Sequence, residues 1–165
     1  MFWPNGRIID AREETGIAKI KLNGWEAELI EEESKRLDFV VWLRNPSKTW
    51  GLCLPYDMGG VKKAFYPDFL IVRYVRDSGY TGYVVDVLEP HGDQYADNLP
   101  KAKALAEYAK RENRLGRIQL IRKTTSIAGS KFLRLDFTDR ETREKVLRAT
   151  TDDDLNNIFT TCGRT

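Results

Sequence analysis

The sequence holds only two cysteines, Cys53 and Cys162, and a single histidine, His91. The cysteines lie far apart and lack C-x-x-C spacing, so the chain alone builds neither a disulfide framework nor a thiolate zinc site. One histidine is too few for multi-histidine zinc or iron sites. Any metal ion bound here therefore needs oxygen ligands.

Two nucleotide-binding motifs are also missing. Neither G-x-x-x-x-G-K-[ST] nor G-x-G-x-x-G occurs, so nucleotide hydrolysis and dinucleotide binding have no support from the sequence. The apolar runs are far shorter than the roughly 18 residues of a membrane helix. The first residues lack the basic stretch, the apolar stretch and the cleavage site of a secretory signal. We therefore expect a cytoplasmic protein that does not bind membranes.

The chain has the composition of a globular protein, with 165 residues, 41% of them hydrophobic and 32% charged, and a net charge of +2. This near neutrality hides an asymmetry along the sequence. Residues 10–38 hold nine acids against five bases, whereas residues 99–134 hold ten bases against two acids. Such a basic cluster is typical of phosphate neutralisation in nucleic-acid binding, although a solvated helix face gives the same pattern.

Hydrophobic spacing and turn signals predict an α/β fold with a central mixed β-sheet flanked by helices. One domain is expected over residues 1–165, with a core of about 22–122 and a C-terminal strand and helices of unassigned role over 123–165. Asn23 is a suitable cap for the first helix, and Asp97 or Asn98 for the second. The expected helices are residues 24–37, 98–113, 139–149 and 152–159, and the expected strands are residues 39–43, 50–54, 64–75, 83–90, 117–122 and 131–137.

A hairpin signal at residues 77–82 sets two acids against each other. If the turn is centred near Ser78 or Gly79, Asp68 and Glu89 are about equally far from it, so they should lie opposite each other across the ladder. Opposed like charges are destabilising unless something offsets them, and a hard divalent cation such as Mg²⁺ is the obvious offset. Strand alternation places His91 on the side of Glu89 and Asp86 on the other face. The alternative is that both acids are ordinary polar residues at strand ends.

Several short motifs, taken in order, resemble one family of nucleases. They are Asn23-Gly24-Trp25-Glu26, Val41-Trp42-Leu43-Arg44-Asn45, Leu54-Pro55-Tyr56, Tyr66-Pro67-Asp68-Phe69 and Glu89-Pro90-His91-Gly92, followed by Lys101 and Lys103. Their order over residues 22–121 resembles the PD-(D/E)XK nuclease domain at the C-terminal end of the restriction subunit of type III restriction enzymes and of related DEAD/DEAH-type helicases. The resemblance implies a restriction-endonuclease-like core and a metal-dependent endodeoxyribonuclease.

The same resemblance implies roles for individual residues. Asp68 and Glu89 would hold Mg²⁺, or Mn²⁺ as a substitute, together with the backbone carbonyl of Pro90. Glu26 would be an accessory acid on the first helix. The family has a lysine two residues after the second acid, where this chain has His91. Either the imidazole substitutes for that lysine, or a lysine of the following helix (Lys101 or Lys103) replaces it, or cleavage has been lost.

The expected mechanism is phosphodiester hydrolysis by a metal-activated water, with the metal stabilising the leaving oxygen. The bases expected to contact the DNA backbone are Lys101, Lys103, Arg114, Arg117 and Lys123. The expected partners are DNA, a helicase or ATPase motor on another segment or chain, and a methyltransferase or recognition subunit. The main alternative is a nuclease fold that no longer cleaves and instead binds DNA or docks a partner subunit. A weaker alternative is a structural adaptor that joins subunits through its acidic and basic faces.

Overall fold

A computed structural model describes residues 21–47, 51–77, 79–92, 95–112, 116–126 and 129–165. Its centre is a five-stranded sheet in the order β1-β4-β5-β6-β7, and β2 and β3 form a separate two-stranded ribbon. The strands are β1 (Phe39–Arg44), β2 (Leu54–Met58), β3 (Val61–Phe65), β4 (Phe69–Asp77), β5 (Tyr80–Pro90), β6 (Ile118–Ser126) and β7 (Gly129–Asp136). The helices are α1 (Gly24–Ser34), α2 (Asn98–Glu112), α3 (Arg140–Arg148) and α4 (Asp152–Cys162).

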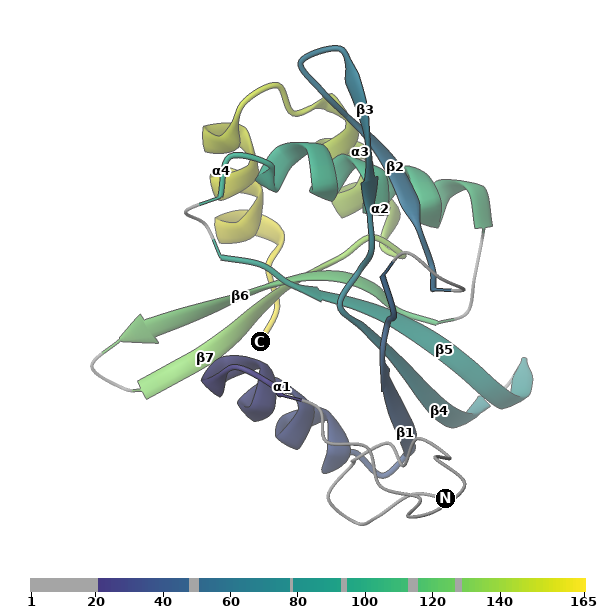
Figure 1. Ribbon diagram of the computed structural model, residues 1–165. Coiled ribbons are helices and arrows are strands. Elements are labelled where there is room, and N and C mark those ends of the chain that lie inside the picture. The colour runs from purple at the N-terminus through teal and green to yellow at the C-terminus, as the bar shows by residue number, and fades with distance from the viewer. Residues whose placement is uncertain (1–20, 48–50, 78, 93–94, 113–115, 127–128) are drawn as a thin grey trace.

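The sheet is mixed because one connection crosses over it. Strands β1 and β4, β4 and β5, and β6 and β7 pair antiparallel, whereas β5 and β6 pair parallel. Helix α2 lies in the connection between the two parallel strands. A parallel pair needs such a crossover connection, because a tight turn cannot join its strands. Figure 1 shows α1 on one side of the sheet and α2, α3 and α4 on the other. The prediction of a mixed sheet flanked by helices is confirmed.

Each face of the sheet carries its own hydrophobic core. Under α1, Leu29 and Ile30 pack against strand residues that include Ile71. On the other face, α2 packs the small side chains that the sequence predicts for its buried side, such as Ala102 and Ala106. Small residues let the helix lie close to the strands, which brings its first turn near the end of β5.

The C-terminal segment belongs to the core on the α2 face. Strand β7 pairs with β6 over eight residue pairs from Gln119–Asp136 to Ser126–Gly129. Val146 of α3 and Leu155 of α4 are fully buried in the cluster that also holds the α2 alanines. Thr151 and Asp154 form a capping box that starts α4. Residues after 122 therefore complete the packing of the α2 face, and Phe132 of β7 adds to the core under α1.

Helix α1 is shorter than its apolar pattern predicts. It ends at Ser34, and Leu37, expected as part of its buried stripe, is fully exposed. The last buried position of the helix is Glu33, which is 1% exposed because arginines of the sheet pair with it. A hydrophobic pattern does not identify a glutamate as a buried position, so the pattern predicts a helix that continues to Leu37.

Two predicted strands also differ from the structure. Residues 51–53 are not in a strand, because the Asn45 side chain bonds both the N–H and the carbonyl of Leu52 and holds this segment as a loop. The long run over 64–75 is split into β3 and β4 around Pro67, which has no N–H to donate to a ladder. The ribbon of β2 and β3 therefore leaves the sheet just before Asp68 (Figure 1).

Helix α2, with 15 residues, begins at Asn98 and carries lysine and arginine in its last turn. Those bases suit the negative end of the helix dipole. No helix in the described part of the chain is long and apolar enough to span a membrane.

Candidate active site at the end of the central hairpin

The β4–β5 hairpin brings Asp68 and Glu89 together, as the turn arithmetic predicts. Its register pairs Phe69 with Leu88, and the next positions outward are Asp68 and Glu89. Glu89 Oε2 accepts a hydrogen bond from the Asp68 backbone N–H at 3.0 Å. Glu89 is 3% exposed, whereas the Asp68 side chain is 26% exposed. One acid is therefore buried, and the other lies at the rim of the site.

His91 lies on the same side of β5 as Glu89, and Asp86 lies on the opposite face, as strand alternation predicts. The His91 Nδ1 is 3.3 Å from Glu89 Oε1, and its Nε2 is 3.2 Å from Asp97 Oδ1. The Tyr95 ring covers the imidazole, with the centroids 4.9 Å apart. The imidazole is thus buried and fixed between two carboxylates.

Helix α2 brings one of the two candidate lysines to the acids. Lys101 Nζ is 3.9 Å from Glu89 Oε1 and 3.2 Å from Asp97 Oδ2, and it lies over the Phe65 ring at 5.2 Å. Lys103 is two positions further on, about 200° around the helix axis. No contact between Lys103 and either acid is present in the described part of the structure. Of the two lysines, Lys101 is therefore the one that lies beside Glu89.

The predicted accessory acid, Glu26, reaches the site through an arginine. Glu26 closes the capping box of α1, where its N–H donates to Asn23 Oδ1 and its Oε2 accepts from the Asn23 N–H. Arg44, at the end of β1, donates Nη1 to Glu26 Oε1 at 3.0 Å and Nη2 to Asp68 Oδ1 at 2.9 Å. Arg44 therefore separates Glu26 from Asp68 and links the two.

Burial and an excess of acids together raise the pKa of Asp68. Burial is the first cause and the charge of Glu89 the second, and together they raise the pKa of Asp68 to about 7, against the opposing effects of Arg44 and Lys101. For Asp97, burial opposes ionisation, but the hydrogen bond and the charge of Lys101 hold its pKa below the usual range. Near neutral pH Asp68 is therefore only partly charged.

The oxygen donors at this site suit a hard cation whose remaining ligands are water molecules and substrate oxygens. Asp68 and Glu89 offer carboxylate oxygens, and Pro90, next to Glu89 at the end of β5, offers a backbone carbonyl. Among the described residues, no group of three or more His, Cys, Asp and Glu side chains is arranged to hold a metal ion. Mg²⁺ commonly uses one or two carboxylates plus water and phosphate oxygens. The two acids match that smaller requirement.

The other predicted phosphate contacts lie away from the carboxylates. Arg117 donates to Glu33 and Asp86 on the α1 face of the sheet. Lys123 pairs with Glu28 of α1 at 2.6 Å. Arg114 lies outside the described residues. Of the predicted basic residues whose side chains the structure describes, Lys101 is the one at the acid pair.

Two residues of the site were given no role there by the sequence. Asp97 was expected only as a helix cap, but it holds both His91 and Lys101. Its spacing of four residues before Lys101 is the signal that could have identified it. Arg44 lies within one of the motifs quoted above, but nothing local indicates that it bridges Glu26 and Asp68.

The fold and the site together define an α/β protein with a mixed sheet and a partly buried carboxylate pair at the end of its central hairpin. The model of the YagJ family matches residues 7–164, so the chain belongs to the YagJ family. It is 36% identical over 110 residues to Protein YagJ of Escherichia coli (strain K12). That alignment covers 66% of this chain and 42% of the relative, so the chain spans less than half the length of the curated protein it matches. No solved structure matches the chain.

Proposed function

We propose that this chain is a metal-dependent nuclease domain that hydrolyses phosphodiester bonds in DNA. The observation that carries the proposal is the Asp68–Glu89 pair, two partly buried acids at neighbouring strand ends, where Glu89 accepts from the Asp68 N–H and the two charges repel. Such an arrangement costs stability in the free protein, and a divalent cation offsets that cost. The family descriptions name no activity, so this proposal depends on the site alone.

The residues around the pair have distinct tasks in this proposal. A bound Mg²⁺ supplies Lewis-acid chemistry, lowering the pKa of water and neutralising phosphate charge. Lys101 places a permanent positive charge where the phosphate would approach the acids. His91, fixed by Glu89 and Asp97, can orient the attacking water or accept its proton. Arg44 holds the Asp68 carboxylate in place.

The finer form of the proposal is a restriction-endonuclease-like core. The order of parts supports it: a first helix with Glu26, a hairpin with the two acids, and a crossover helix with Lys101. In this form the chain is cytoplasmic and works with a helicase or ATPase motor and a methyltransferase or recognition subunit, each on another segment or chain. These partners are proposed on the resemblance alone.

A cleavage assay tests the proposal directly. Plasmid and single-stranded DNA are incubated with Mg²⁺ or Mn²⁺ between pH 6 and pH 9, using wild type, Asp68→Asn and Glu89→Gln. We expect both variants to lose about 100-fold or more in rate, because the metal ligands are removed. Glu107→Gln, an exposed acid on α2, is the matched control and should cleave like wild type. Metal-dependent cleavage that survives in Asp68→Asn and Glu89→Gln would contradict the proposal.

Two lysines of the same helix give a second, sharper comparison. Lys101→Ala should lower the cleavage rate about 100-fold, because it removes a preformed positive charge beside the acids. Lys103→Ala removes the same charge two positions away and should stay close to wild type. Equal losses in the two variants would show that the helix contributes general basicity and not a positioned ammonium.

A second candidate function is a nuclease fold that binds DNA or docks a partner without cutting. One observation favours it: both acids already have partners within the chain, Arg44 for Asp68 and the Asp68 backbone with His91 for Glu89. If wild type binds DNA but remains inert with both metals at high protein concentration, this alternative becomes the better one. A stabilising effect of Mg²⁺ that disappears in Asp68→Ala would favour the nuclease instead.

A further inference from the structure

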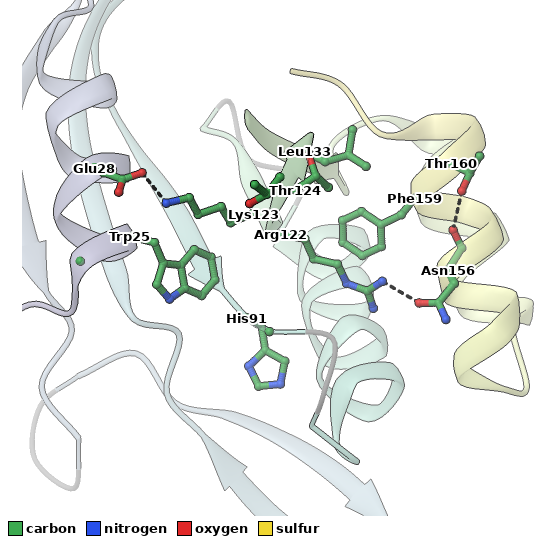
Figure 2. A pocket seen from close by; sticks show the side chains of 13 residues that line it. Trp25, Glu28, His91, Arg122, Lys123, Thr124, Leu133, Asn156, Phe159 and Thr160 are labelled. Carbon is green, nitrogen blue, oxygen red and sulfur yellow. Dashed lines mark hydrogen bonds and ion pairs between the residues drawn. The ribbon is translucent and has the colours of Figure 1, made fainter. Parts of the chain in front are cut away.

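A second concave site shares His91 with the carboxylate pair. It is a pocket of about 780 Å³ between the start of α1, the strands β6 and β7, and α4. Figure 2 shows the side chains that line it. Those that matter for its chemistry are Trp25, Glu28, His91, Arg122, Lys123 and Phe159. The nuclease proposal uses only the histidine among them.

Two cations and one acid line the pocket. Lys123 Nζ is 2.6 Å from Glu28 Oε2, and the Glu28 side chain is 52% exposed. Arg122 donates to Asn156 Oδ1 at 2.6 Å, and its guanidinium lies 4.1 Å from the centre of the Phe159 ring. These contacts fix both cations at the wall, and the single acid offsets one of them. The pocket therefore favours an anionic ligand.

The wall also presents a rigid aromatic ring. Trp25 is partly exposed at the pocket and is stacked on Phe132, with centroids 6.3 Å apart and planes at 20°. Because the ring is already held on one side by Phe132, little side-chain freedom is lost when a ligand packs against it. A flat ligand with a negatively charged group would match Trp25 and the two cations together.

We propose that this pocket holds one unpaired nucleotide of the strand whose phosphate lies at Asp68 and Glu89. The base packs on Trp25, and the phosphates on its two sides lie against Lys123, beside α1, and Arg122, beside α4. This inference rests on the nuclease proposal and adds the substrate class, a single strand or a duplex with an unpaired end. A volume of about 780 Å³ is within the usual range for small-ligand pockets. A base stacked inside a duplex cannot enter such a pocket.

Binding without cleavage tests the inference separately from the nuclease activity. Fluorescence anisotropy is measured in EDTA with an oligothymidine and with a blunt duplex of equal length. Wild type should bind the single strand more tightly than the duplex. Trp25→Ala should weaken single-strand binding about tenfold, and Trp25→Phe should retain most of it, since stacking needs only an aromatic ring. Equal affinity of wild type for both DNAs would overturn the inference.

A charge pair provides the matched control. Lys123→Ala should weaken single-strand binding and lower its salt dependence, because one phosphate contact is lost. Lys145→Ala also removes a lysine paired with a glutamate, Glu141 at 2.7 Å, but on α3 outside the pocket. It should bind like wild type. Equal losses in the two variants would show that only overall positive charge matters.

A crosslinking measurement guards against variants that fold poorly. An oligonucleotide carrying 5-iodouracil is irradiated with the wild-type protein, and the labelled peptide is identified by mass spectrometry. We expect the label on the peptide that contains Trp25. A label confined to Tyr80 and Tyr83, the exposed tyrosines near the tip of the β4–β5 hairpin, would overturn the pocket as the base site. If DNA cleavage is absent but the Trp25 results hold, the nuclease proposal fails and the nucleotide pocket remains.

Discussion

Two clusters of charged side chains lie on opposite faces of the central sheet, and they differ in how well acids and bases are matched. Under α1, Asp86 contacts Arg73 and Arg117, and Glu33 contacts Arg117 and Arg134. Each buried acid there has at least two arginines, and Glu33 has a third in Arg36. At the end of the hairpin the permanent cations are fewer than the acids. The acids there are Glu26, Asp68, Glu89 and Asp97, and the cations are Arg44 and Lys101.

This difference reverses the effect of burial on the two aspartates. Burial alone would raise the pKa of Asp86, but the hydrogen bond from Arg73 and the charge of Arg117 hold that pKa below its ordinary value. At Asp68, burial and the charge of Glu89 raise the pKa to about 7. The same side chain is therefore stabilised as an anion on one face and destabilised as an anion on the other. The matched cluster stabilises its ionised acids, whereas the unmatched one keeps an excess of negative charge, on which the proposed cation site depends.

The largest effect is expected from breaking the matched cluster. Asp86→Ala should lower the free energy of unfolding by about 3–5 kcal/mol, because Arg73 and Arg117 are left without their buried partner. Urea unfolding at pH 7 in EDTA measures this change. Asp68→Ala is the control on the other face and should lose far less. A loss below about 1 kcal/mol in Asp86→Ala would place the network among ordinary surface ion pairs.

Replacing Asp68 by a neutral amide should change the stability in the opposite direction. The folded protein disfavours ionised Asp68, so stability falls as pH rises from the ordinary pKa of 3.8 to about 7. Asp68→Asn removes this titration and should stabilise the metal-free protein by about 2 kcal/mol at pH 8, with no gain below about pH 4. Asp86→Asn should destabilise it at pH 8. Thermal unfolding in EDTA at pH 8 and below about pH 4 measures these changes. A gain in stability of Asp68→Asn that is the same at both pH values would contradict the charge argument.

The sequence predicts the fold and the acid pair because both depend on local signals. Helix caps such as Asn23 and Asp139 satisfy the first turns of their helices regardless of what packs around them. The hairpin turn fixes the register, so simple counting places Asp68 opposite Glu89. Alternation along β5 then separates Asp86 from both. These inferences need only neighbours along the chain or across one turn.

The remainder depends on pairs that are far apart in the sequence. The sequence predicts Arg117 at phosphate, but this side chain is partly buried between Asp86 and Glu33, and Glu33 is 84 residues away in the chain. Charged residues are assigned to solvent by default, and only the folded structure shows which of them find a partner. For the same reason the sequence does not predict the role of Arg44 at the site. It also wrongly predicts that α1 continues to Leu37.

The smallest effect is expected at the position where the resemblance calls for a lysine. Lys101 already places an ammonium 3.9 Å from Glu89, so His91→Lys adds a second cation between Glu89 and Asp97. The added charge offsets the excess of acid, and the variant should therefore bind Mg²⁺ more weakly. At saturating Mg²⁺ its cleavage rate should stay within about tenfold of wild type, or 1.4 kcal/mol in the barrier. Rates measured against Mg²⁺ concentration at pH 8 separate the two effects. A gain above tenfold at saturation would mean that Lys101 does not replace the missing lysine, and a loss of that size would mean that the imidazole itself moves a proton.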